Sequence, residues 1–138
     1  MSRDKTRYEK TPSITTFLFA EDPVASQDLL VKAFGLERGE VSRDGDGKAV
    51  VARAYLGEYA VSVARPHPGK MEPARNSNVL HSLVMVYLDD VDSVFKQATA
   101  AGAKIEYEPV DMPYGQREFG ARDADGNLWC FAKRLTDD

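Results

Sequence analysis

The feature that most constrains the fold is a repeat in the order of helix signals. An aspartate and a glycine recur at the same separation, as Asp22 and Gly35 in the first half and as Asp89 and Gly102 in the second. Aspartate is a favoured helix N-cap and glycine is favoured just beyond a helix C-terminus. Each pair therefore brackets one predicted helix, and each of the two helices carries an apolar stripe at helical spacing.

Apolar segments surround both predicted helices in the same order. One strand precedes each helix and three follow it, so the chain is predicted to contain two βαβββ modules and to have an α+β fold. A turn at 44–47, rich in Asp and Gly, separates the second and third strands of the first module. The other predicted strands are 14–20, 50–56, 59–64, 83–88, 104–108, 118–122 and 128–133.

The boundaries of the two modules follow from composition. Residues 66–78 contain three prolines, a glycine and two asparagines, which is typical of a connector. A module of about 65 residues with one helix buries little surface alone, so the two are expected to share one domain. We predict a flexible tail at 1–11 and a single domain at 12–135, with modules at about 12–65 and 79–135.

Charge and apolar content exclude several classes of partner. The net charge of −4 argues against nucleic acid and against an anionic membrane surface, since both require a basic face. No apolar run is long enough to span a bilayer. The chain has one cysteine and no hydrophobic signal segment, so we expect a cytoplasmic protein.

The C-terminal segment carries a family resemblance. The segment PYGQREF at 113–119 leads into RDADGNLWCF at 122–131, a pattern that predicts a strand, a tight turn and a second strand. This string closely resembles the end of the vicinal oxygen chelate superfamily, the glyoxalase/bleomycin-resistance/dioxygenase group. With the repeat, the resemblance covers about 12–135. It implies a curled mixed sheet around a central pocket, and it implies a homodimer.

The same resemblance implies where a metal would be held. Metal-dependent members use one ligand on the first strand of each module, a histidine or glutamine, and a glutamate on the last strand. The matching positions here are predicted to be Thr15, Val61, Leu83 and Cys130. Such side chains do not suit a hard divalent ion, so we expect no metal and no cofactor. His81, two residues before Leu83 on the same strand side, is the alternative ligand.

Strand alternation predicts which side chains line the pocket. Phe17 shares a side with Thr15, and Met85 and Tyr87 share a side with Leu83, whereas Trp129 is predicted to face the helices. Tyr114 and Gln116, on a loop, are predicted at the pocket rim. The roles of Arg53, Arg117 and Arg122 stay open. The predicted ligand-binding residues are Thr15, Phe17, Val61, Leu83, Met85, Tyr87, Tyr114, Gln116 and Cys130.

An apolar, aromatic pocket suits a hydrophobic or aromatic small organic ligand. The leading hypothesis is a metal-independent binding protein that sequesters a toxic compound, as in the bleomycin-resistance branch. One alternative is a metal-dependent glyoxalase-like lyase, isomerase or dioxygenase that uses His81. A further alternative is a dimeric structural protein whose pocket is filled by its own side chains.

Overall fold

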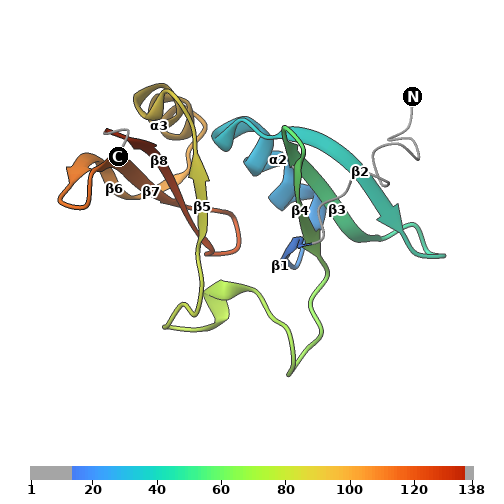
Figure 1. Cartoon of the computed structure of the whole chain (residues 1–138). Helices are drawn as coiled ribbons and strands as arrows, with labels where there is room; N and C mark the ends of the chain where they lie inside the picture. The colour runs from blue at the N-terminus through green and yellow to red at the C-terminus, as the bar shows by residue number, and fades with distance from the viewer. Residues whose placement is uncertain (1–13, 136–138) are drawn as a thin grey trace.

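The computed structural model describes residues 14–135, and the predicted flexible tail at 1–11 lies outside the described residues. Figure 1 shows two modules joined by a long connector. Each module has the predicted order of one strand, one helix and three strands. Module one contains β1 (Thr16–Phe19), α2 (Pro23–Phe34), β2 (Glu37–Arg43), β3 (Ala49–Leu56) and β4 (Tyr59–Ala64). Module two contains β5 (Val84–Tyr87), α3 (Val91–Ala100), β6 (Lys104–Met112), β7 (Gln116–Arg122) and β8 (Leu128–Arg134).

Each module forms a mixed four-stranded sheet, and this confirms the predicted α+β class. The strand orders are β1-β4-β3-β2 and β5-β8-β7-β6, so the two sheets have the same topology. The first and last strands of each module pair in parallel, and the other neighbours are antiparallel. The last strand of each module therefore lies inside its sheet, beside the first.

The predicted helix signals match the observed ends closely. Asp22 caps α2, because its Oδ1 accepts a hydrogen bond of 3.1 Å from the Ala25 amide, and Gly35 ends the helix with φ 76°. In module two the cap is Asp90, whose Oδ1 accepts a bond of 3.0 Å from the Ser93 amide. The repeat therefore pairs Asp22 with Asp90, one residue later than the sequence spacing predicts.

A single apolar core joins the two modules. Phe34 of α2 lies against β8 of the other module, with its ring centroid 5.4 Å from that of Trp129 and 5.0 Å from that of Phe131. Phe119 of β7 stacks on Phe131 at 5.0 Å. The predicted placement of Trp129 toward the helices is confirmed. Below, the face of each sheet that meets this core is called its core face, and the opposite face its outer face.

The connector between β4 and β5 is fixed to module two. It contains a short 3-10 helix, η1 (Ala74–Asn76). The Arg75 amide donates to the Asp125 carbonyl at 2.8 Å, and its guanidinium donates to the Asp125 carboxylate at 2.7 Å. A Cβ on Gly126 would lie 2.9 Å from the Arg75 nitrogen, so the β7–β8 turn meets the connector at close range. Within residues 14–135, neither helix has the length and apolarity required to cross a bilayer.

Candidate ligand-binding site

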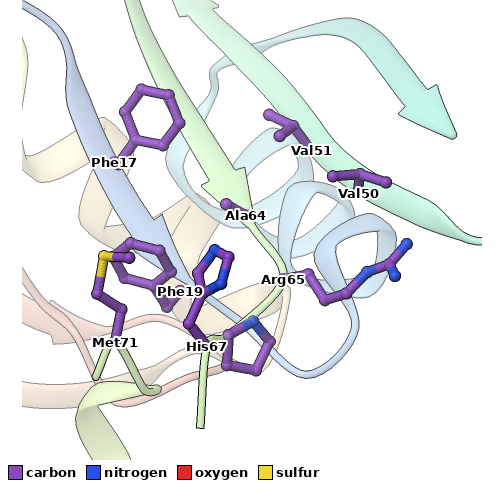
Figure 2. A pocket seen from close by; sticks show the side chains of 9 residues that line it. Phe17, Phe19, Val50, Val51, Ala64, Arg65, His67 and Met71 are labelled. Atoms are coloured by element: carbon purple, nitrogen blue, oxygen red, sulfur yellow. The ribbon is translucent and has the colours of Figure 1, made fainter. Parts of the chain in front are cut away.

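The outer face of module one contains a hollow of about 620 Å³. Strands β1, β3 and β4 form its floor and the first part of the connector forms its wall, as Figure 2 shows. We call it the module-one hollow. Its lining residues are Phe17, Phe19, Val50, Val51, Ala64, Arg65, Pro66, His67 and Met71.

Small neighbours make room for the two phenylalanine rings. The parallel register places Phe17 opposite Ser62 and Phe19 opposite Ala64, so each ring stands beside a small side chain. The connector closes one side through a tight turn, in which the His67 amide donates to the Met71 carbonyl at 2.7 Å. The hollow is therefore mainly apolar, and Arg65 and His67 add polar groups to its lining, as Figure 2 shows.

The outer face of module two carries a polar network centred on Glu118. The Glu118 carboxylate is only 2% exposed. It accepts hydrogen bonds from the Tyr107 hydroxyl at 2.5 Å, the Tyr114 hydroxyl at 2.7 Å and the Gln116 amide nitrogen at 2.8 Å. The Tyr107 hydroxyl also lies 3.2 Å from the Cys130 sulfur. Three donors, from β6, from the β6–β7 turn and from β7, thus converge on one carboxylate.

Close packing holds Tyr107 in this position. Gly120 faces Tyr107 across the β6–β7 pair, and a Cβ on Gly120 would lie 2.5 Å from the Tyr107 ring. The ring therefore occupies the space that any larger residue would need. This contact directs the phenol along the outer face toward Glu118 and Cys130 on the neighbouring strands.

The network favours an ionised Glu118 and neutral phenols. Burial raises the pKa of Glu118, but the hydrogen bonds from Tyr107, Tyr114 and Gln116 outweigh burial and the net pKa lies below its ordinary value. The hydrogen bond to Glu118 is the main cause that raises the pKa of Tyr114 to about 12. Burial, together with the bonds to Cys130 and Glu118, also raises the pKa of Tyr107. Burial raises the pKa of the Cys130 thiol, which disfavours a thiolate nucleophile.

The module-two residues predicted from alternation do share one face. Met85 pairs with Cys130 and Tyr87 pairs with Ala132, so these side chains all lie on the outer face. Tyr87 is 54% exposed, and its hydroxyl lies 3.2 Å from the Gln116 amide oxygen. Leu83 precedes β5 and is exposed.

The placement of Val61 differs from the prediction. In the register Val61 pairs with Thr16, and it packs against the core rather than beside Phe17. The error arose because positions were counted from the glycine of each hairpin. The β3–β4 hairpin closes at Leu56 and Tyr59, whereas the β7–β8 turn has a longer loop between Arg122 and Leu128. Counting from the strand pairing instead, the position in module one that corresponds to Cys130 is Ser62.

The predicted residues consequently occupy different sites. Phe17 lies in the module-one hollow, and Thr15, just before β1, is not part of its lining. Val61, Met85 and Tyr87 instead line a second hollow of about 420 Å³ between the modules. The predicted single cleft is therefore divided between the two modules within this chain.

The loop predicted at the rim contributes to the network instead. Tyr114 is 64% exposed and covers Glu118, while Gln116 is buried beneath it. The residue patterns did not single out Glu118 or Tyr107. Strand alternation carried the missing signal, because Glu118 shares its side of β7 with Gln116 and Gly120.

The three arginines with open roles all make ion pairs. Arg117 bridges Asp92 at 3.1 Å and Asp111 at 3.0 Å on the surface. Arg122 pairs with Glu106 at 2.6 Å. Arg53 lies 3.5 Å from Glu40 on the outer face of module one. These contacts tie neighbouring strands and the α3 region together.

Comparisons with known proteins identify the family. The fold is that of paired βαβββ modules, and residues 13–131 match the model of the Glyoxalase/Bleomycin resistance protein/Dioxygenase superfamily. The chain belongs to this superfamily. No curated protein matches it by sequence.

Several solved structures share the fold. TioX from Micromonospora sp. ML1 is 31% identical, with a TM-score of 0.71, over 90% of this chain and 99% of that chain. A glyoxalase/bleomycin resistance protein/dioxygenase family enzyme from Burkholderia phytofirmans PsJN is 21% identical, with a TM-score of 0.68, over 88% and 97%. Lactoylglutathione lyase from Agrobacterium tumefaciens is 23% identical, with a TM-score of 0.60, over 88% and 94%. The last two likenesses show the fold alone.

The divalent ion implied by the family does not fit the residues at its usual positions. These are Thr15, Ser62, Leu83 and Cys130, which supply two hydroxyls, an alkyl group and a thiol. The thiol already contacts Tyr107. His81 is exposed in the connector, before β5 begins. Across residues 14–135, no three His, Cys, Asp or Glu side chains are grouped as metal ligands would be.

Proposed function

We propose that this protein is a metal-independent small-molecule binding protein that sequesters a hydrophobic or aromatic toxic compound. The module-one hollow carries the proposal, because its volume of about 620 Å³ suits a small organic ligand. Its floor offers the rings of Phe17 and Phe19 for stacking and dispersion contacts. Sequestration needs buried area and a few polar contacts, and it requires no catalytic group.

We further propose that the protein acts as a homodimer. The two outer faces turn away from the shared core, so neither covers the other within one chain. Phe17 is 49% exposed, and Met85 and Tyr87 on the outer face of module two are exposed as well. A second copy placed over these faces would shield this apolar surface from bulk water and enclose a bound ligand between the two chains. Sedimentation equilibrium should then give twice the 15.3 kDa chain mass, and a monomer at all concentrations would contradict the dimer.

We propose that the protein binds its ligand in the cytoplasm. The chain has a single cysteine, Cys130, which is buried and free. A buried free thiol persists most readily in a reducing compartment. Fractionation of cells that produce the protein would test this placement, and recovery from the exported fraction would contradict it.

The first test measures thermal stability with divalent metals and with an apolar probe. A ligand at about 100 times its Kd stabilises by roughly 2.7 kcal/mol. For a domain of this size, that free energy raises Tm by roughly 10 °C. We expect such a rise with N-phenyl-1-naphthylamine. We expect no rise with Mn²⁺, Co²⁺, Ni²⁺ or Zn²⁺ relative to a chelator control, and a clear rise with one metal would favour the enzyme alternative.

Variants locate the bound probe. Phe17→Ala should weaken the affinity for N-phenyl-1-naphthylamine by about 1–3 kcal/mol, because its ring lines the module-one hollow. Tyr87 lies outside this hollow, so the same loss in Tyr87→Ala would place the probe in the second hollow instead. His81→Ala is the control, and its affinity should be unchanged because His81 is an exposed connector residue. A loss above roughly 100-fold in His81→Ala would overturn the metal-independent reading.

A further inference from the structure

The hydrogen bonds around Glu118 all run in one direction. An ionised carboxylate only accepts hydrogen bonds. Tyr107, Tyr114 and Gln116 must therefore each donate a hydrogen bond to Glu118. The three donor–acceptor distances are 2.5, 2.7 and 2.8 Å. The Tyr114 hydroxyl has a single hydrogen, and that hydrogen is committed to Glu118.

The same constraint passes through Gln116 to Tyr87. Because Glu118 requires the nitrogen end of the Gln116 amide, the oxygen end must point the other way. The Tyr87 hydroxyl meets that oxygen at 3.2 Å, so Tyr87 donates its hydrogen to Gln116. One buried carboxylate thus orients the hydrogens of two exposed tyrosines toward the protein interior.

Because their hydrogens are already donated, the hydroxyls of Tyr87 and Tyr114 can only accept hydrogen bonds from a ligand. Tyr87 is 54% exposed and Tyr114 is 64% exposed, and both present oxygen lone pairs to the solvent. Among residues 14–135, Glu118 makes no ion pair that would neutralise its charge. The Arg134 guanidinium lies over the Tyr87 ring, 5.7 Å from its centroid, rather than against Glu118.

We propose that the outer face of module two is a donor-selective subsite, which binds the N–H groups of an aromatic amine, amide or amidinium. The hydroxyl oxygens of Tyr87 and Tyr114 accept these hydrogen bonds, and their rings contact the aromatic part of the ligand. Glu118 is a positioning residue that fixes the direction of the hydroxyls. This inference rests on the proposed small-molecule binding and names its ligand class. Carboxylates and phosphates are disfavoured at the two hydroxyl oxygens, because these oxygens can only accept hydrogen bonds.

Three probes that share one ring system test the inference. They are 2-naphthamidine, a cationic donor, 2-naphthamide, a neutral donor, and 2-naphthoate, an anionic acceptor. Binding of each to the full chain is followed by NMR chemical-shift titration at neutral pH. A hydrogen bond to a charged group contributes enough for about a tenfold change in Kd, so naphthamidine should bind at least about tenfold more tightly than naphthoate.

Two variants separate polarity from shape. In Glu118→Gln the new amide can itself donate, so the tyrosine hydroxyls are released and the preference should fall below about threefold. The double variant Tyr87→Phe with Tyr114→Phe keeps both rings and removes both acceptors, and the preference should fall in the same way. The matched control is Tyr55→Phe, which removes a tyrosine–carboxylate hydrogen bond of 2.6 Å in module one. Tyr55→Phe should bind naphthamidine more tightly than naphthoate by the same factor as the native protein.

Each remaining outcome decides a different point. Equal binding of naphthoate and naphthamidine, or a preference that survives both variants, would overturn the donor-selective subsite. The proposed function would stand if N-phenyl-1-naphthylamine still bound. If that probe and all three naphthyl compounds failed to bind at about 5 mM, the proposed function and this inference would both be overturned. Circular dichroism shows whether Glu118→Gln is folded, and the double variant tests the inference if it is not.

Discussion

The outer faces of the two modules differ in chemistry although their sheets share one topology. Module one presents a hollow lined by Phe17 and Phe19, and module two presents the carboxylate of Glu118 with its donors. The core faces are both apolar. Because alternate residues of a strand face opposite sides, the outer face can change while the core face is kept. The repeat therefore specifies the framework, and the outer residues specify what each module can bind.

A closer parallel shows where the difference lies. Tyr55 of module one lies against Gly39 and donates to Glu40 at 2.6 Å, as Tyr107 lies against Gly120 and donates to Glu118. The charge of Glu40 is balanced by Arg53. Glu118 receives neutral donors alone within residues 14–135. Of these two carboxylates, Glu118 is therefore the one whose charge no cation balances within residues 14–135.

The largest expected effect comes from removing the two carboxylates. Glu118→Ala removes a buried carboxylate and leaves Tyr107, Tyr114 and Gln116 without their acceptor, so it should lower the free energy of unfolding by about 2–4 kcal/mol. Glu40→Ala affects a half-buried group and should cost about 1 kcal/mol. Urea unfolding followed by circular dichroism measures both. Equal losses would show that the two carboxylates are equally buried in solution.

The two glycines give a second contrast. A Cβ at residue 39 would lie 2.7 Å from the Arg53 carbonyl oxygen as well as 2.5 Å from the Tyr55 ring, so backbone must move. At residue 120 the three nearest atoms all belong to the Tyr107 side chain. Gly39→Ala should therefore cost about 2–3 kcal/mol and Gly120→Ala about 1–2 kcal/mol in unfolding free energy. The reverse order, measured by urea unfolding, would show that the Tyr107 ring is the more rigid neighbour.

The structurally corresponding positions Cys130 and Ser62 should respond in opposite ways. Cys130 contacts the Tyr107 hydroxyl at 3.2 Å, so Cys130→Ala should cost about 1 kcal/mol. The Ser62 hydroxyl is fully buried and has no hydrogen-bond partner among residues 14–135. Ser62→Ala should be neutral or stabilise by up to about 1 kcal/mol. Calorimetric melting compares them, and a clear loss of stability in Ser62→Ala would reveal a partner for its hydroxyl.

The smallest effect is spectroscopic and concerns the tyrosines of module two. The pKa of Tyr114 is raised to about 12, first by its hydrogen bond to Glu118. A raised pKa in the folded state means that this hydrogen bond contributes fully below about pH 10 and is lost as the pH rises through 12. The phenolate absorbance of the native protein minus that of Tyr114→Phe should show a midpoint near 12. In Glu118→Gln the midpoint should return toward 10, and an unchanged midpoint would remove Glu118 as the cause.

The framework was predictable from sequence because its signals are local. Caps, glycine stops and apolar segments predicted both helices and the order of helices and strands along the chain, and alternation predicted that Trp129 lies in the core. The β3–β4 hairpin was also predicted closely, at 50–56 and 59–64. Its residue-by-residue correspondence with the β7–β8 hairpin was not, because the loop between Arg122 and Leu128 is longer than the loop between Leu56 and Tyr59.

The candidate site was less predictable because it depends on contacts between distant strands. Glu118 is an ordinary charged strand residue in the sequence, and its burial arises from Tyr107 on β6 and Tyr114 on the preceding turn. The close approach of Tyr107 to Gly120 is also set by register. No local pattern encodes these distances, and so the network emerged only from the structure.

The position of the last strand in each module has a consequence for the order of folding. β4 lies between β1 and β3, and β8 lies between β5 and β7. During synthesis, the first strand of each module must therefore wait, without its neighbour, until the final strand has been made. Such non-local closure slows folding and leaves an unpaired strand exposed in the meantime. In this chain, β1 stays without its neighbour until synthesis has passed Ala64, and β5 stays without its neighbour until synthesis has passed Arg134.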